Sequence, residues 1–215
     1  MLSLTQDILN NLGLKLSVNH VEPHKSKTKC VAFGLSNNPA PLLLDGSPLP
    51  WCDSYKHLGH ILYRDGSLKL DVEKRRTSFI GTFHALRQEL KQQNPTVLME
   101  LIDIYLAHFY GSNLWNLSNI DCVYTTWNNV LRNVYQLPPR THRYILEPFT
   151  ERSHLFTRLT NRFINFYKTL FFSSKNVIRT LVMSQMSDCR SSFGSNIKMI
   201  CRYNGTTDIF LCKKI

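Results

Sequence analysis

The stretch 71-DVEKRRTSFIGTFHALRQEL-90 marks the point at which the hydrophobic pattern changes from that of strands and turns to that of helices. Apolar residues recur in it at helical spacing and form one stripe: Val72, Phe79, Phe83, Leu86 and Leu90. Basic residues cluster towards the opposite face: Lys74, Arg75, Arg76 and Arg87. This pattern predicts an amphipathic helix with a buried face and a basic face. We interpret Asp71 and Glu73 as caps that interact favourably with the helix dipole.

Strand and turn patterns occupy the residues before Gly66. The segment 14-LKLSV-18 alternates apolar and polar residues, 30-CVAF-33 is a short apolar run typical of a buried strand, and Asp45-Gly46 and Asp65-Gly66 are turn dipeptides. Prolines at positions 39, 41, 48 and 50 confine the region between these segments to a loop or an edge strand. Residues 2–13 have the pattern of a helix that ends at Gly13.

Helical patterns continue after residue 90. The run 97-VLMELIDIYLAHFYGSNLW-115 is apolar nearly all round and predicts one buried helix. Ser118 and Asp121 predict a capping box that opens the next helix, which Pro138-Pro139 ends. A further amphipathic helix is expected over roughly 153–172.

These patterns together predict an α+β fold: a small N-terminal helix and strand region with a β-hairpin, followed by a mainly α-helical bundle. We place the first region at 1–66 and the helical region at 67–186. Residues 187–215 show weak periodicity, so we expect a poorly structured tail there.

The charge of the chain favours a polyanionic partner. Its 215 residues include 26 Lys and Arg against 15 Asp and Glu, for a net charge of +11. Basic residues are absent between Lys91 and Arg132 and frequent on both sides of this segment. This distribution suits a helical core element between two surfaces that face phosphates, and a solvated basic face is the alternative.

The cysteines and the N-terminus indicate an intracellular protein, in the cytoplasm or the nucleus. Six cysteines occur without a CxxC pair, which favours reduced thiols over a disulfide framework. Residues 1–13 lack a cationic and then apolar leader pattern, and no uncharged run reaches the roughly 18 residues of a membrane span.

Motifs for catalysis or metal binding are not found in the sequence. Phosphoryl transfer on nucleic acids commonly uses paired carboxylates that hold two divalent metal ions, and no DD, DxD or ExD pair stands at a strand or turn. Cys52, His57 and His60 resemble part of a zinc site, but their spacing matches no zinc finger, and in 55-YKHLGHILY-63 we expect the two histidines on opposite faces of a strand. We therefore expect no metal site in this chain.

The order of several short motifs resembles the C-terminal part of reverse transcriptases of non-LTR (LINE-type) retrotransposons. The motifs are GLKL, a basic loop ending in KSKTKCVAF, a Pro-rich connection, YKHLGHIL, Asp-Gly, the basic amphipathic helix and FYGSNLW. The runs 137-LPPRTHRYILEP-148 and 188-DCRSSFGSN-196 are similar to segments located C-terminal to the polymerase in such elements. The resemblance covers most of the chain.

This resemblance implies that the N-terminal region is the end of a palm and that the later helices form a thumb. Residues implied to contact nucleic acid are Lys25, Lys27 and Lys29 of the basic loop, Tyr55, Lys56, His57 and Gly59 of a primer-gripping hairpin, and Lys74, Arg75, Arg76 and Arg87 of the thumb. Gly59 would allow close backbone approach. Contacts of this kind position nucleic acid without reading its sequence.

The resemblance also implies that the catalytic Tyr-x-Asp-Asp turn of the family lies outside this chain. We therefore expect a truncated polymerase that is inactive alone, with no cofactor of its own, and magnesium only in the intact enzyme. The expected partner is an RNA or DNA primer–template, with no membrane. Two alternatives stay open: a non-catalytic, sequence-independent nucleic-acid-binding module, and a helical interaction protein that associates with a partner or with itself through exposed apolar surface.

Overall fold

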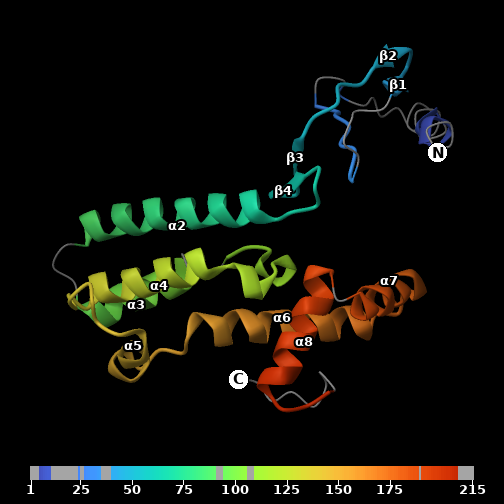
Figure 1. Cartoon of the computed structure of the whole chain (residues 1–215). Helices are drawn as coiled ribbons and strands as arrows, with labels where there is room; N and C mark the ends of the chain where they lie inside the picture. Colours follow the sequence, from blue (N-terminus) through green and yellow to red (C-terminus); the bar gives the residue numbers. More distant parts are fainter. Residues whose placement is uncertain are drawn as a thin grey trace. The chain divides into compact units, whose positions relative to one another are not determined.

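The structure is a computed structural model that describes residues 5–10, 24, 27–34, 40–90, 94–105, 109–188 and 190–207. It confirms an α+β fold that is mainly helical (Figure 1). The chain divides into two compact units, Met1–Asp71 and Val72–Ile215. The division therefore falls in the first turn of a helix and not at Gly66, where the sequence pattern changes.

The described residues of the first unit include two short antiparallel hairpins. β1 (Leu43–Leu44) pairs with β2 (Ser47–Pro48), and β3 (Ser54–His57) pairs with β4 (His60–Tyr63). The predicted Asp45-Gly46 turn is confirmed: it joins β1 to β2, and both of its residues have positive φ, at 48° and 71°. An Asp-Gly pair favours this geometry because neither residue has a bulky β-branched side chain that would clash there.

The remainder of the first unit differs from the predicted strand pattern. Cys30 makes only an isolated parallel bridge to Trp51, and the chain then turns at Phe33 and Gly34. The prediction of a buried strand through Phe33 is wrong, since this side chain is 55% exposed. Residues 5–10 are helical, and the predicted strand 14–18 and the helix end at Gly13 lie outside the described residues.

The second unit is helical over most of its described length. Its elements are α2 (Lys69–Glu89, which begins in the first unit), α3 (Pro95–Tyr105), the 3-10 turns η1 (Ser112–Leu114) and η2 (Leu117–Asn119), α4 (Asp121–Val134), α5 (Arg143–Thr150), α6 (Leu155–Phe171), α7 (Asn176–Ser187) and α8 (Ser192–Tyr203). The predicted helices over 71–90 and 153–172 correspond closely to α2 and α6.

Aromatic side chains form the centre of the core of this unit. Phe79 of α2 packs against Phe109 and Trp127, with ring centroids 5.2 Å and 6.2 Å apart. The stripe predicted for α2 is largely confirmed, because Val72, Phe79 and Phe83 are buried. Trp127 and Phe163, from α4 and α6, are almost fully buried as well. Helical spacing places such residues on one face of each helix, where they pack together.

The region between α3 and α4 differs from the single helix predicted over 97–115. Gly111 has a φ of 75°, and the chain continues in two 3-10 turns. The predicted capping box is also wrong: α4 follows Ile120, which provides no side-chain cap, and Asn116 instead caps η2 by accepting from the Ser118 amide. Trp115, Leu117 and Ile120 are buried in this irregular region, whereas Leu114 is 42% exposed, so its apolar residues do not form the all-round buried helix that was predicted.

The expected poorly structured tail contains helix α8. Asn196, 1% exposed, accepts a hydrogen bond from the Leu117 amide at 2.8 Å and donates to the Trp115 carbonyl at 2.7 Å. These bonds give backbone groups of the irregular region a buried hydrogen-bond partner. The prediction of a poorly structured tail is therefore wrong for Ser192–Tyr203, which forms a helix despite the weak periodicity.

No helix in the described parts of the chain is both long enough and apolar enough to cross a membrane.

Candidate nucleic-acid interface

The tip of the β3–β4 hairpin presents an apolar side chain in a strained backbone conformation. Leu58 and Gly59 form the two-residue turn, with φ of 46° and 85°. Turns of this type favour Asn-Gly, because a residue with a large side chain is strained at positive φ. Leu58 is nevertheless 76% exposed, so no burial offsets this strain. An exposed apolar residue held at a strained tip is a candidate contact residue.

The base of this hairpin is anchored to the start of α2 through Asp71. This buried carboxylate accepts from the Ile61 amide at 3.2 Å and lies 3.3 Å from Nδ1 of His60. The sequence suggested only an interaction of Asp71 with the helix dipole, and the structure adds a second role. It ties strand β4 to the first turn of α2.

The two histidines of the hairpin lie beside each other. His57 and His60 are directly paired across the turn, so the expectation that they occupy opposite faces of one strand is wrong. Within the described residues, no group of three His, Cys, Asp or Glu side chains is placed to hold a metal ion.

The basic loop lies next to this hairpin in the first unit. The Tyr55 hydroxyl donates to the Lys27 carbonyl at 3.3 Å, which connects the loop to β3. Lys27, Lys29, Lys56 and His57 are exposed, whereas Lys25 lies outside the described residues. The structure therefore brings several of the implied contact residues to one part of the first unit.

The basic residues of α2 have a different environment from the one expected. Arg75 lies over the Tyr110 ring, 5.2 Å from its centroid, and Arg87 donates to the Asn133 side chain. Arg76 pairs with Glu73 and reaches Thr126 of α4. These three arginines contact protein side chains, and Lys74 is exposed. Helical periodicity in the sequence could not reveal these contacts, because long arginine side chains can reach residues of neighbouring helices.

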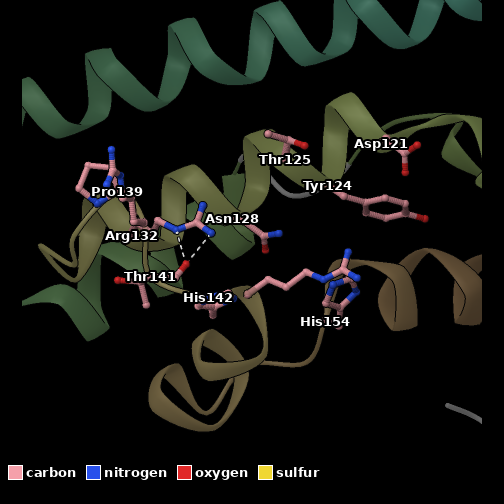
Figure 2. A pocket seen from close by; sticks show the side chains of 11 residues that line it. Asp121, Tyr124, Thr125, Asn128, Arg132, Pro139, Thr141, His142 and His154 are labelled. Atoms are coloured by element: carbon pink, nitrogen blue, oxygen red, sulfur yellow. Dashed lines mark hydrogen bonds between the residues drawn. The ribbon is translucent and has the colours of Figure 1, made fainter.

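A pocket in the second unit collects basic residues that helical periodicity does not single out. It has a volume of about 530 Å³ and is lined from α4, from the loop before α5 and from the start of α6 (Figure 2). We call it the α4–α5 pocket. Its lining residues are Asp121, Tyr124, Thr125, Asn128, Arg132, Pro139, Arg140, Thr141, His142, Arg143 and His154.

Arg132 fixes the wall of this pocket. Its Nε and Nη2 donate to the Thr141 carbonyl at 3.0 Å and 2.8 Å, as Figure 2 shows, and its Nη1 donates to Asn129 at 2.9 Å. A guanidinium has five N–H donors, so two remain for a ligand. Arg140 and Arg143 are exposed, and the described residues provide neither of them with an ion-pair partner.

The opposite wall of the pocket is held by His154 and Tyr124. Nδ1 of His154 accepts from the Phe156 amide at 3.0 Å and so caps α6. The Tyr124 hydroxyl donates to the Leu117 carbonyl at 3.3 Å. Burial, with a smaller contribution from the nearby Asp121 carboxylate, raises the pKa of Tyr124 well above its ordinary value of 10.0. Tyr124 is therefore a neutral hydrogen-bond donor here.

Several other arginines of this unit pair with a carboxylate or pack against core side chains. Asp103 accepts from both Arg152 and Arg158 at 2.6 Å, and Arg158 also lies over the Trp127 ring. Burial lowers the pKa of Arg162, with a further contribution from the charge of Arg158. The α4–α5 pocket therefore differs from the other arginine sites, because its guanidinium groups outnumber its single carboxylate, Asp121.

A sequence signal for this pocket exists in the run 137-LPPRTHRYILEP-148. Arg140, His142 and Arg143 lie within four positions of one another, between a proline pair and a short apolar segment. The family resemblance includes this run, but its periodicity does not predict α5, which contains Pro148.

Comparisons with protein-family models, with curated proteins and with solved structures find no match to this chain.

Proposed function

We propose that this chain is a nucleic-acid-binding part of a reverse transcriptase of the non-LTR retrotransposon type. In this proposal the β3–β4 hairpin contacts the primer–template, and basic residues of the helical unit contact its phosphate backbone. The chain positions nucleic acid and carries out no bond-forming step itself. Its place of action is the cytoplasm or the nucleus, where primer and template are found.

The observation that carries this proposal is the tip of the hairpin. Leu58 is both strained, with a φ of 46°, and 76% exposed. Folding alone would favour a small or polar residue at this position, since Asn-Gly forms the same turn with less strain. Apolar side chains at such positions can pack against bases or sugars of a bound nucleic acid. The strain is then explained by binding rather than by stability.

The charge around the hairpin supports the same proposal. Lys56 and His57 precede the tip, and the Lys27 carbonyl accepts from the Tyr55 hydroxyl, so two exposed lysines lie in the same region as the apolar contact. The net charge of +11 favours association with a polyanion. The segment 55-YKHLGHIL-62 resembles the primer-gripping hairpin of the family, and this resemblance is the reason for proposing a primer–template as the ligand.

The test is a fluorescence-anisotropy titration of the full chain with a labelled RNA–DNA hybrid at several salt concentrations. We expect log K to fall linearly with log salt, with a slope of about −0.9 for each phosphate neutralised. Lys56→Gln should reduce this slope by about 1, and Leu58→Asn should weaken binding without changing the slope. Lys198→Gln, at an exposed position of α8, is the charge-matched control.

Two results would contradict the proposal. One is absence of binding at low salt. The other is an equal loss of affinity in Lys56→Gln and Lys198→Gln, with no loss in Leu58→Asn, which would mean that only the net charge matters.

A second candidate function is association through the surface of α7. Val177 and Leu181 lie one helical turn apart and are 73% and 59% exposed, whereas Val182 faces the core. An apolar pair of this kind can meet a second copy of the chain. Sedimentation velocity should then show concentration-dependent dimers that Val177→Ser with Leu181→Ser abolishes. A monomer at every concentration would exclude this function.

A further inference from the structure

We propose that the α4–α5 pocket and the neighbouring ring of Tyr144 bind single-stranded nucleic acid, with a phosphate held by Arg140 and Arg143 and a base stacked on Tyr144. This inference rests on the proposed function for the class of its ligand, but it concerns a different surface and a different form of nucleic acid. No part of the family resemblance assigns it.

The pocket suits a phosphate because three arginines and one carboxylate line it. Arg132, Arg140 and Arg143 line it, and Asp121 is the one carboxylate among the lining residues. Arg132 is held in place by the Thr141 carbonyl and by Asn129, which leaves it preorganised to donate further bonds. Guanidinium groups match phosphate oxygens well, because two N–H donors can bind two oxygens at once.

An exposed aromatic ring lies beside pocket-lining His142. Tyr144 is 70% exposed and lies in the first turn of α5, directly after pocket-lining Arg143. Its ring lies 5.2 Å from that of His142, at an angle of 31°, and His142 itself lines the pocket. The two rings therefore form an aromatic surface that continues from the basic wall.

A single strand fits this combination better than a duplex. Duplex bases stack on one another and present phosphates to a protein, whereas unpaired bases can stack on aromatic side chains while the backbone follows a basic groove. The pocket volume of about 530 Å³ is within the range of sites that hold small ligands. One nucleotide, with its phosphate inside the pocket and its base stacked on Tyr144, uses both features.

The experiment compares a labelled oligothymidylate strand with a hairpin duplex that carries the same number of phosphates, both titrated with the full chain. We expect the strand to bind more tightly at moderate salt. Tyr144→Ala should weaken binding of the strand roughly 5- to 100-fold, the usual effect of losing one stacked base, while Tyr144→Phe should bind like the unchanged chain.

Arg140→Gln with Arg143→Gln should weaken binding of the strand and reduce its salt slope by about 0.7, because the two arginines hold one phosphate and each single-strand phosphate contributes about 0.7. The charge-matched control is Lys175→Gln with Arg179→Gln, two exposed cations at the start of α7. Tyr203→Ala removes another exposed tyrosine of the same unit and should leave affinity unchanged. Circular dichroism verifies that each variant is folded.

Three results would overturn this inference: unchanged affinity in Tyr144→Ala, equal losses in the two charge-matched pairs, or competition by polyglutamate as effective as by unlabelled strand, which would indicate an acidic protein as the ligand. The hairpin variant Leu58→Asn separates this inference from the proposed function. Loss of duplex binding in that variant concerns only the hairpin, whereas loss of strand binding in the pocket variants concerns only the pocket.

Discussion

At the scale of single residues, Gly194 is required by the close approach of α8 to the end of α7. A Cβ at this position would lie 2.4 Å from the Asp188 carbonyl oxygen and 2.9 Å from that of Gln185. Both are backbone atoms and cannot move independently. Gly194→Ala should therefore lower the free energy of unfolding by roughly 1–3 kcal/mol, as for other overpacked sites, measured by urea denaturation.

Gly81 is the matched control for this prediction. It lies inside α2, and a Cβ there would meet no atom within 4 Å. Gly81→Ala should raise the free energy of unfolding by about 0.5–1 kcal/mol, because alanine restricts the unfolded chain more than glycine does. Equal effects of the two substitutions would show that the contact of Gly194 has no energetic importance.

Leu58 provides a prediction in which stability and binding change in opposite directions. Leu58→Asn should stabilise the protein by about 1 kcal/mol, since asparagine adopts positive φ more readily and the leucine side chain is exposed. Gly59→Ala, at a φ of 85°, should destabilise it. Thermal denaturation measures both effects. Destabilisation by Leu58→Asn would mean that the leucine has a structural role and would remove the main support for the proposed function.

At the scale of elements, the irregular segment between α3 and α4 depends on a residue far along the chain. Asn196→Ala would remove the buried side chain that bonds to the Leu117 amide and to the Trp115 carbonyl, at a cost of roughly 1–3 kcal/mol for each lost bond. We expect urea denaturation to show a loss of at least about 2 kcal/mol. Asn165→Ala, an exposed asparagine of α6, should have little effect. A small effect of Asn196→Ala would mean that water replaces its bonds.

The amphipathic elements were the ones that sequence patterns predicted well. α2 and α6 have their apolar residues at helical spacing, so the stripe itself indicates both the helix and its buried face. α5 was missed because it is short and contains Pro148, whereas α8 was missed although Phe193, Ile197 and Ile200 recur in it at helical spacing. α8 also makes tertiary contacts, such as the hydrogen bonds of Asn196, which sequence periodicity cannot reveal.

At the scale of the whole molecule, the two units should differ in stability. The buried apolar side chains among the described residues of the first unit are Leu42, Leu44 and Leu49, whereas the second unit has a large aromatic core. Amides of the β3–β4 ladder should therefore exchange with solvent faster than those of α4 and α6 in native-state hydrogen exchange. Uniform protection across the units would instead show that they unfold together.

By itself the sequence determined the mainly helical α+β class, the Asp45-Gly46 turn and the buried stripe of α2, because each of these depends on neighbouring residues. It also determined the net charge. Only the tertiary structure decided which basic residues face solvent: it packs Arg75, Arg76 and Arg87 against other side chains and leaves Arg140 and Arg143 exposed beside a pocket. The reason is physical, since an arginine can reach partners that are distant in sequence, and local patterns contain no information about those partners.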